Sequence, residues 1–367
     1  MRDDTGYLQE LLDRGGEVFV PGREYTVTKP LLIGDNTTLR LAPNAVIRLG
    51  DGAGCVLIEN EGFRERRRNH NITVTGGTWD GNNKNQVRGR PESGYEDDAA
   101  TGIAMRFIGV DDLTLSNLTI KDPESYATHL CNLNRFTIDH ITFDFNLLRA
   151  NMDGIHVNGP ARFGRITNIM GATNDDLVAL NCDDAAWCEP YRGDITDVEV
   201  DGLFADCGYT AVRLLSSGST LRNVSISNIF GTYRFYAVSF THHNIHPGEP
   251  ILLENVTVRN VFASKPTWVP DEASTHYYPP SHSHWVEREP LIWFAPGVLA
   301  RNITVSDVHR TEEAVTHAGT IVVDENAVVE NLMIRDVTQR FAACEPVPTV
   351  EIRGRVDGLR LDNVQEI

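Results

Sequence analysis

The sequence has no run of 18 apolar residues and no two cysteines in a C-x-x-C arrangement. The first absence excludes a transmembrane helix, and the second removes a common signature of zinc and redox sites. Positive charge is scarce as well, because 33 Lys+Arg stand against 51 Asp+Glu and leave a formal net charge of −18. Such a surplus repels phosphate backbones and anionic lipid surfaces, so neither nucleic acid nor a membrane is expected as a partner. An acidic polymer would bind only where a local cationic groove overcomes this field.

The first residues, MRDDTGYLQELLDRGG, contain no basic segment followed by an apolar one. No secretory signal is therefore visible, and cytoplasmic residence is expected. The six cysteines are scattered, which favours buried single thiols. One pair, Cys182 and Cys188, lies close enough in NCDDAAWC to form a disulfide.

An internal repeat runs through most of the sequence. Each copy has a polar residue followed by two short alternating apolar segments, separated in most copies by Asn, Asp or Gly, as in NVTVRNVFA. Alternation of apolar and polar residues is typical of half-buried strands, and most copies follow a third strand-like segment such as GIHV or LVAL. The ten copies begin at Asn71, Asp112, Arg135, Arg165, Asp197, Asn223, Asn255, Asn302, Asn331 and Gly358.

Three short strands in each copy predict an all-β fold, a single-stranded right-handed parallel β-helix of about ten or eleven rungs. The leucine spacing and helix of leucine-rich repeats are absent, and no amphipathic helices separate the strands as a TIM barrel would require. A short capping helix is predicted near Asp4–Asp13, ending at Gly15-Gly16. We expect one domain over residues 1–367, with the N-terminal cap and first strands in residues 1–35.

Three aspartates precede two successive strand segments. Asp153 comes before GIHV, and Asp175-Asp176 come before LVAL, so aligning the two segments places Asp176 directly over Asp153, one rung later. Carboxylates this close cannot all ionise cheaply, and one is expected to keep its proton near neutral pH. A protonated and an ionised carboxyl are the minimum set for hydrolysis of a glycosidic bond. Aspartates also line β-helix turns as hydrogen-bonding ladders, and the spacing alone fits both interpretations.

These residues resemble motifs of glycoside hydrolase family 28, the polygalacturonase family of pectin-cleaving β-helices. NMDGIHV resembles its NTDG motif, NDDLVALN its DD motif, and GGTWDGNN its GGxxDGxG segment. The resemblance implies a divergent member that hydrolyses glycosidic bonds with inversion and without a metal or cofactor. It implies Asp175 as the general acid, and Asp153 and Asp176 as the residues that hold and deprotonate the attacking water. Inversion ordinarily requires the acid and base carboxyls to lie about 6.5–9.5 Å apart.

Two motifs of that family are missing. The histidine of its GHG motif is replaced by Thr210 in Gly208-Tyr209-Thr210, and its RIK motif is replaced by Val238-Ser239-Phe240-Thr241. The family's Arg and Lys bind the carboxylate of the substrate, so their loss argues against plain polygalacturonate. Together with the acidic net charge, it favours a neutral or sparsely charged oligo- or polysaccharide.

Other side chains are expected to contact the substrate. Arg213 is predicted to lie in one outward-facing row with His156, Ala179 and Ser239, where it could substitute for the missing cations. Residues 80–102 and 265–289 interrupt the repeat and are expected to flank the cleft, and the second segment would also suit a homo-oligomer contact. The candidate substrate-binding residues are Arg213, His129, His156, Tyr209, Thr210, His242, Trp268 and Trp285.

Two further classes of function fit the same sequence. One is a carbohydrate-active lyase, epimerase or glycosyl transferase; such chemistry on uronates often uses Ca²⁺, which the acidic segment from Asp183 to Asp194 could bind. The other is a non-catalytic, glycan-binding β-helix in which the aspartates are ladder residues only. Release of an unsaturated uronate would indicate a lyase, and absence of any cleavage would favour the binding module.

Overall fold

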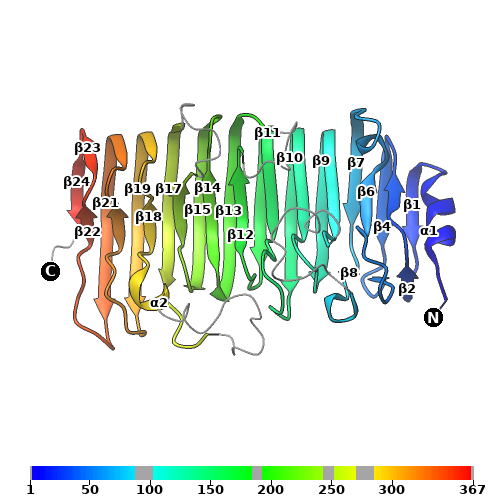
Figure 1. The fold of residues 1–367 in the computed structure, drawn as a ribbon, viewed down its shortest axis with the longest axis horizontal. Coiled ribbons are helices and arrows are strands. Elements are labelled where there is room, and N and C mark those ends of the chain that lie inside the picture. The colour runs from blue at the N-terminus through cyan, green and yellow to red at the C-terminus, as the bar shows by residue number, and fades with distance from the viewer. Residues whose placement is uncertain (1, 87–101, 184–191, 243–251, 270–284, 365–367) are drawn as a thin grey trace.

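Neighbouring strands are parallel in every pairing that the structure describes, and each pairing joins strands one rung apart along the chain. The computed structural model describes residues 2–86, 102–183, 192–242, 252–269 and 285–364. In these residues the strands stack side by side along one long axis, from α1 at the N-terminal end to β24 at the C-terminal end (Figure 1). The predicted parallel β-helix is confirmed.

The helices are α1 (Thr5–Leu12) and α2 (Trp285–Arg288), with 3-10 turns η1 (Glu61–Phe63) and η2 (Asn83–Asn85). The strands of the N-terminal half are β1 (Gly16–Val20), β2 (Glu24–Val27), β3 (Leu31–Ile33), β4 (Thr37–Leu41), β5 (Val46–Leu49), β6 (Ile58–Asn60), β7 (Asn69–Thr75), β8 (Thr78–Asp80), β9 (Met105–Lys121), β10 (Thr128–Asp144), β11 (Ile155–Met170) and β12 (Asp176–Asn181). Those of the C-terminal half are β13 (Ile195–Gly208), β14 (Thr210–Leu215), β15 (Thr220–Tyr233), β16 (Val238–Thr241), β17 (Leu252–Ser264), β18 (Ile292–Phe294), β19 (Leu299–Glu312), β20 (Ile321–Val323), β21 (Val328–Phe341), β22 (Val350–Ile352), β23 (Arg355–Asp357) and β24 (Arg360–Val364).

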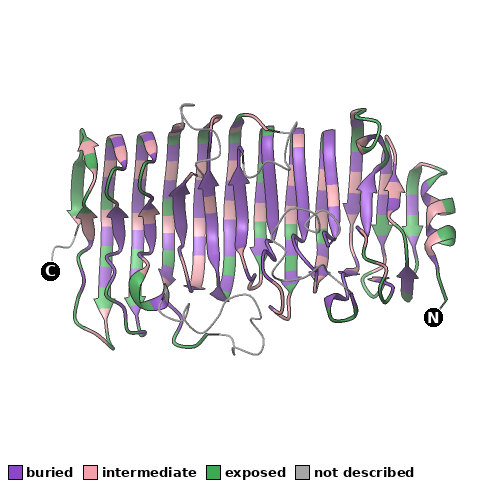
Figure 2. Ribbon diagram, viewed as in Figure 1, coloured by how far each residue is buried: buried purple, intermediate pink, exposed green. Residues whose placement is uncertain are grey.

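The strands divide into short and long ones that serve different faces of the helix. The short strands β12, β14, β16, β18, β20 and β22 pair with one another and make one face. The long strands β13, β15, β17, β19 and β21 cover the rest of each rung. Inward-facing Leu, Ile, Val and Phe side chains fill the interior as one continuous core, seen as buried bands along the strands (Figure 2). Burial of this apolar surface is the main force that holds the rungs together.

A turn residue with left-handed backbone recurs in each rung and explains the polar residue that starts each repeat. Asparagine adopts this conformation more readily than most residues, and its side chain can bond the same residue one rung away. Asn255 Nδ2 donates to Asn223 Oδ1 at 3.0 Å, and Asn302 Nδ2 donates to Asn255 Oδ1 at 2.9 Å. We call this row the turn ladder; its members are Gly15, Asn36, Asn71, Asp112, Arg135, Phe163, Asp197, Asn223, Asn255, Asn302, Asn331 and Gly358.

One predicted repeat boundary is wrong by two residues. The sequence pattern starts the fourth copy at Arg165, but the register pairs Asn134 with Arg162 and Phe136 with Gly164. The ladder position of this rung is therefore Phe163, which has a φ of 58°. The pattern fails here because an aromatic residue occupies the position of the polar one, and a glycine occupies the position of the first apolar one.

The N-terminal end of the core is covered by α1, as the cap prediction requires. Its Leu8 and Leu12 are buried in the core. The helix ends at Leu12, and Gly15 and Gly16 take left-handed backbone where the chain turns into β1. No helix among the described residues is long and apolar enough to cross a bilayer. Cys182 is a buried thiol whose pKa is raised by burial, while Cys188 lies outside the described residues.

Candidate active site

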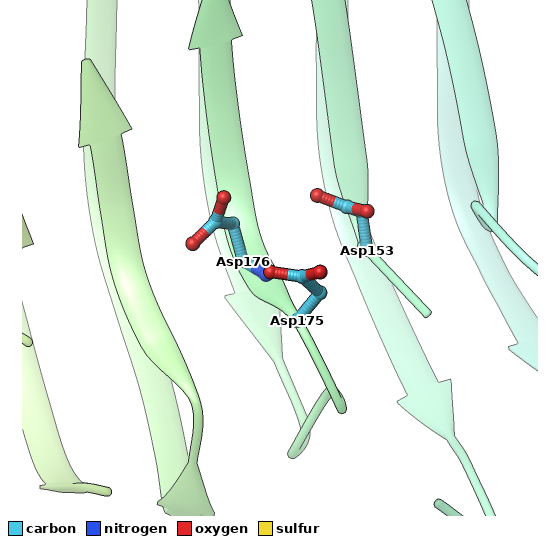
Figure 3. A group of neighbouring side chains, drawn as sticks. All are labelled: Asp153, Asp175 and Asp176. Atoms are coloured by element: carbon cyan, nitrogen blue, oxygen red, sulfur yellow. The ribbon is translucent and has the colours of Figure 1, made fainter. Parts of the chain in front are cut away.

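The three predicted aspartates lie together where the strands of the short-strand face begin. Ile155 of β11 pairs with Val178 of β12, and the amide of Gly154 donates to the carbonyl of Asp176 at 2.9 Å. This register sets Asp176 over Asp153 on adjacent rungs, as the alignment of GIHV with LVAL predicts. One carboxylate oxygen from each of Asp153, Asp175 and Asp176 lies within 4.8 Å of the others, and the three side chains gather on two neighbouring rungs (Figure 3). We call these residues the aspartate cluster.

Buried polar contacts hold the turn that presents Asp175 and Asp176. The Thr173 hydroxyl donates to the Asp175 carbonyl at 2.6 Å, and Asn174 Nδ2 donates to the carbonyl of Arg149 at 2.7 Å. The guanidinium of Arg234 then donates to the carbonyl of Thr173 at 3.2 Å and to Asn174 Oδ1 at 3.1 Å. Sequence reasoning missed Arg234, because it is 60 residues from Asn174 and the repeat gives no sign of a contact across that distance.

The carboxyls of the cluster differ in burial and therefore in proton affinity. Asp176 is 1% exposed, and burial, helped by the negative charge of Asp153, raises its pKa from 3.8 to about 7. Arg213, whose Nη1 lies 3.5 Å from Asp176 Oδ2, opposes this rise, as do His156 and a hydrogen bond with Thr210. Asp175 is only partly buried. A ligand can therefore reach Asp175 more readily than its neighbour.

Replacement of Asp176 by asparagine is expected to raise the melting temperature more at pH 8 than at pH 4.5. The folded chain keeps a proton on Asp176 that the unfolded chain releases above about pH 4, so stability falls as the pH rises from about 4 to about 7. The asparagine removes this penalty because it carries no charge. Thermal melts at both pH values test this, with Asp144→Asn as an exposed control. An equal shift of the variant at both pH values would contradict the assigned burial effect.

Two histidines line the rungs on the N-terminal side of the cluster. His156 Nδ1 lies 3.3 Å from Asp153 Oδ1, and the imidazole stacks on Tyr126 with ring centroids 4.0 Å apart. His129 Nε2 lies 2.8 Å from Asn158 Oδ1, one rung away. Both histidines are buried, and their contacts fix the rings beside the aspartates. Tyr126 carries no motif of its own, and only its place just before the strand-like segment of the third repeat could have pointed to it.

The predicted outward-facing row exists and extends further than expected. His156, Ala179, Arg213 and Ser239 pair in register on successive strands, and the next member is Trp293 of β18. Trp293 stacks on Tyr236 with centroids 4.9 Å apart, and Phe235 continues the aromatic contacts toward Tyr209. Tyr209 and Thr210 are both buried next to Asp176, since Thr210 is its partner in β14. Trp293 was missed because the inserted segment before it hides its place in the row.

Among the other predicted substrate contacts, His242 lies far from the cluster, and Trp268 makes no described contact with it. His242 follows β16, and its Nε2 lies 2.6 Å from the carbonyl of Pro296. Tyr236 is level with Asp176, so His242 lies six residues, or about 20 Å, further along the strand direction. Trp268 is 51% exposed, and its carbonyl accepts from the Cys207 thiol. Trp285 opens α2 and its side chain is outside the described set. Most of residues 80–102 and 265–289 likewise lies outside it.

The cluster could also hold a divalent cation, because hard cations bind carboxylate oxygens in such groups. It already has one cationic neighbour, however, since Nη1 of Arg213 lies 3.5 Å from Asp176 Oδ2. The nearest oxygens are closer than the 6.5–9.5 Å that typically separates the carboxyls of inverting glycosidases. The spacing of the carboxyls therefore gives no support of its own to inversion.

Part of the chain matches a known protein family, and solved structures share its fold. The model of glycosyl hydrolases family 28 matches residues 59–188, a segment that includes all three aspartates. No curated protein matches the chain in sequence. The family 28 exopolygalacturonase of Yersinia enterocolitica aligns with a TM-score of 0.52 and 12% identity, over 100% of this chain and 76% of that one.

Two other solved structures show how widely the fold is used. The hyperthermoactive exopolygalacturonase of Thermotoga maritima aligns with a TM-score of 0.53 and 11% identity, over 97% of this chain and 86% of that one. PfbA, a surface adhesin of Streptococcus pneumoniae, aligns with a TM-score of 0.58 and 13% identity, over 96% and 88%. Identities this low establish a shared fold and leave the activity open. Residues 59–188 thus match glycosyl hydrolases family 28, and the whole chain is a parallel β-helix like those of the solved family 28 exopolygalacturonases.

Proposed function

We propose that the protein is a glycoside hydrolase that cleaves glycosidic bonds by carboxyl acid–base catalysis at the aspartate cluster. One observation carries this proposal: three carboxyls from two adjacent rungs converge within 4.8 Å inside the segment that matches family 28. Aspartates with a purely structural role make different contacts. Asp201, for example, accepts hydrogen bonds from Ser227 and Asn228 on the next rung and, among the described residues, has no carboxyl neighbour in such a group.

In the proposed reaction Asp175 donates a proton to the leaving glycosidic oxygen. Its partial exposure suits a group that must reach the substrate. A water held by Asp153 and Asp176 attacks the anomeric carbon, the bond to the leaving oxygen breaks, and the proton of the water passes to one of these carboxylates. Arg213 and His156 limit the rise that burial causes in the pKa of Asp176. The ionised form of Asp176, which is reached above about pH 7, also stabilises the developing positive charge of the sugar. The match of residues 59–188 to family 28 supports inversion as the proposed stereochemistry.

The proposed substrate is a neutral or sparsely charged oligo- or polysaccharide. Ser239 and Thr241 lie in the segment that we align with the family's Arg- and Lys-bearing motif, and neither carries a positive charge. The next outward residue of the row is Trp293, and its Nε1 donates to the carboxylate of Asp324 at 3.1 Å. The guanidinium of Arg213 already pairs with the carboxyl of Asp176. A substrate carboxylate on this side of the cluster would therefore meet aromatic and acidic groups.

A glycan panel followed by proton NMR tests the proposed function. We expect hydrolysis of a neutral or mixed oligosaccharide in the panel, with the first-formed product carrying the inverted anomeric configuration. Retention would overturn the assigned mechanism, and an unsaturated uronate product would show a lyase. Absence of cleavage across neutral, mixed and uronate oligosaccharides would favour a binding module. The Asp153→Asn variant is the control, since it must abolish any cleavage that depends on the cluster.

A further inference from the structure

A hollow of about 490 Å³ lies on a face of the β-helix away from the short strands. Its lining includes Arg68, Asp111, Arg162, Asp194, Thr196 and Arg222. Between Asn158 and Ala161 the pairing of β11 changes from β12 to β13, so Arg162 belongs to a different face from His156 and Arg213. The aspartate cluster does not line this hollow.

Two arginines in the hollow stand with their guanidinium groups open to a ligand. Arg162 and Arg222 pair in register with Thr196 from either side, which sets them two strands, or about 10 Å, apart. Arg162 donates only through Nε, to Asn134 Oδ1 at 3.0 Å, and Arg222 has no ion pair or side-chain hydrogen bond within the described ranges. Neighbouring Arg135 and Arg165 are each paired with a carboxylate instead.

The acidic residues of the hollow already have partners. Asp111 accepts from Arg68 at 2.7 Å, and Asp194 accepts from the amide of Thr220 at 2.8 Å. The three arginines of the hollow outnumber its two aspartates, on a chain whose formal net charge is −18. A guanidinium binds carboxylate and sulfate groups through paired hydrogen bonds, so an anion is the ligand that this chemistry favours.

An exposed aromatic ring adjoins Arg162. Phe163 is 54% exposed, and the guanidinium of Arg162 lies 5.5 Å from the centre of its ring. The ring borders a second hollow of about 600 Å³. Its carboxylates all have partners: Asp112 pairs with Arg135, Glu199 with Arg165, and Asp197 accepts from Asn223. Phe163 occupies a turn-ladder position with a φ of 58°, where a bulky side chain is strained and makes none of the amide bonds found elsewhere in the ladder. Strain of this kind is a pointer to a role other than folding.

We propose that the two hollows form one binding surface for an anionic oligosaccharide, separate from the aspartate cluster. Phe163 stacks on the apolar face of a sugar ring, as aromatic residues do at glycan sites. Arg162 and Arg222 bind carboxylate or sulfate groups on adjacent sugars. The surface stands independently of the proposed hydrolase activity, because neither its residues nor its ligand takes part in bond cleavage.

Calorimetric titration with four probes tests this surface: tetragalacturonate, a heparin-derived sulfated disaccharide, cellotetraose and inorganic phosphate. We expect an anionic sugar to bind at low ionic strength, more tightly than cellotetraose or phosphate. The double variant Arg162→Gln/Arg222→Gln should weaken this binding at least 10-fold. Tighter binding of the uronate or of the sulfated sugar identifies which anion the surface takes.

The variant Phe163→Asn separates a binding role from a structural one. Asparagine suits the left-handed backbone, so the melting temperature should rise while binding weakens at least 10-fold. Arg213→Gln in the cleft and Arg259→Gln on β17 should leave the dissociation constant within 2-fold. The proposal is overturned if no anionic sugar binds, if phosphate binds as tightly as the sugar, or if Arg213→Gln is the variant that abolishes binding. None of these results depends on whether the protein hydrolyses a glycan.

Discussion

Replacing Asp175 by asparagine is expected to lower kcat for a natural oligosaccharide by about 10²- to 10⁴-fold, the usual contribution of a general acid. The amide is similar in size but has no proton to give to the leaving oxygen. Its carbonyl can still accept the bond that Asp175 Oδ1 receives from the amide of Asp176 at 3.1 Å. Folding should therefore be retained, and substrate binding should change much less than kcat.

The leaving group distinguishes the acid from the other two carboxyls. Fluoride leaves a glycosyl fluoride without being protonated. Asp175→Asn should therefore hydrolyse a glycosyl fluoride at a rate close to that of the unmodified protein. Asp153→Asn should remain slow with the same substrate, because the attacking water still needs its base. Asp144→Asn is the matched control at an exposed carboxylate paired with Lys121. If Asp175→Asn were equally slow with both substrates, Asp175 would not be the acid.

Replacing Glu312 by glutamine is expected to destabilise the fold by about 3–5 kcal/mol, the usual cost of breaking a buried ion pair from one side. Glu312 and Arg310 are both fully buried, and Arg310 Nε donates to Glu312 Oε2 at 2.9 Å. The amide of the buried Lys265 also donates to Glu312, at 3.2 Å to each oxygen. The neutral variant leaves Arg310 buried without its carboxylate partner and removes a negative charge that acts on Lys265.

The effect should depend on pH in a definite direction. Burial, with the charge of Arg310 adding to it, lowers the pKa of Lys265 from 10.5 to about 7. At pH 6 the variant must bury a charged lysine, whereas at pH 9 the lysine can be neutral, so the loss should be smaller at pH 9. Urea midpoints at both pH values measure this. Glu199→Gln, whose exposed carboxylate pairs with Arg165, should cost less than about 1 kcal/mol, and an equal loss in both variants would contradict the buried-pair account.

The fold was predictable because its rungs repeat the same physical requirement. Each rung needs a residue that tolerates left-handed backbone, and asparagine, aspartate or glycine meets this need at ten of the twelve ladder positions. The prediction was wrong where that signal was lost, at Phe163, because a phenylalanine there reads as an inward-facing core residue. Pairing of the strands, which the sequence does not show directly, restores the true register.

The candidate site was predictable only where it depends on the register. Asp153, Asp175 and Asp176 precede strands that align rung on rung, so their proximity follows from the repeat. Arg234 acts across two rungs on Asn174, and His242 is separated from the cluster by the full length of β16. Contacts of these kinds depend on the path of side chains and turns between rungs, which no local pattern encodes.

The turn ladder has a consequence for producing the protein. Asn223, Asn255 and Asn302 are each followed at the second position by Ser or Thr, which makes them acceptors for N-linked glycans in a eukaryotic secretory host. In the folded rungs the side-chain nitrogens of Asn255 and Asn302 donate to the preceding ladder asparagine. A glycan attached to these nitrogens before folding would prevent the hydrogen bonds between ladder asparagines. We therefore expect a bacterial host without this modification to yield the correctly folded protein.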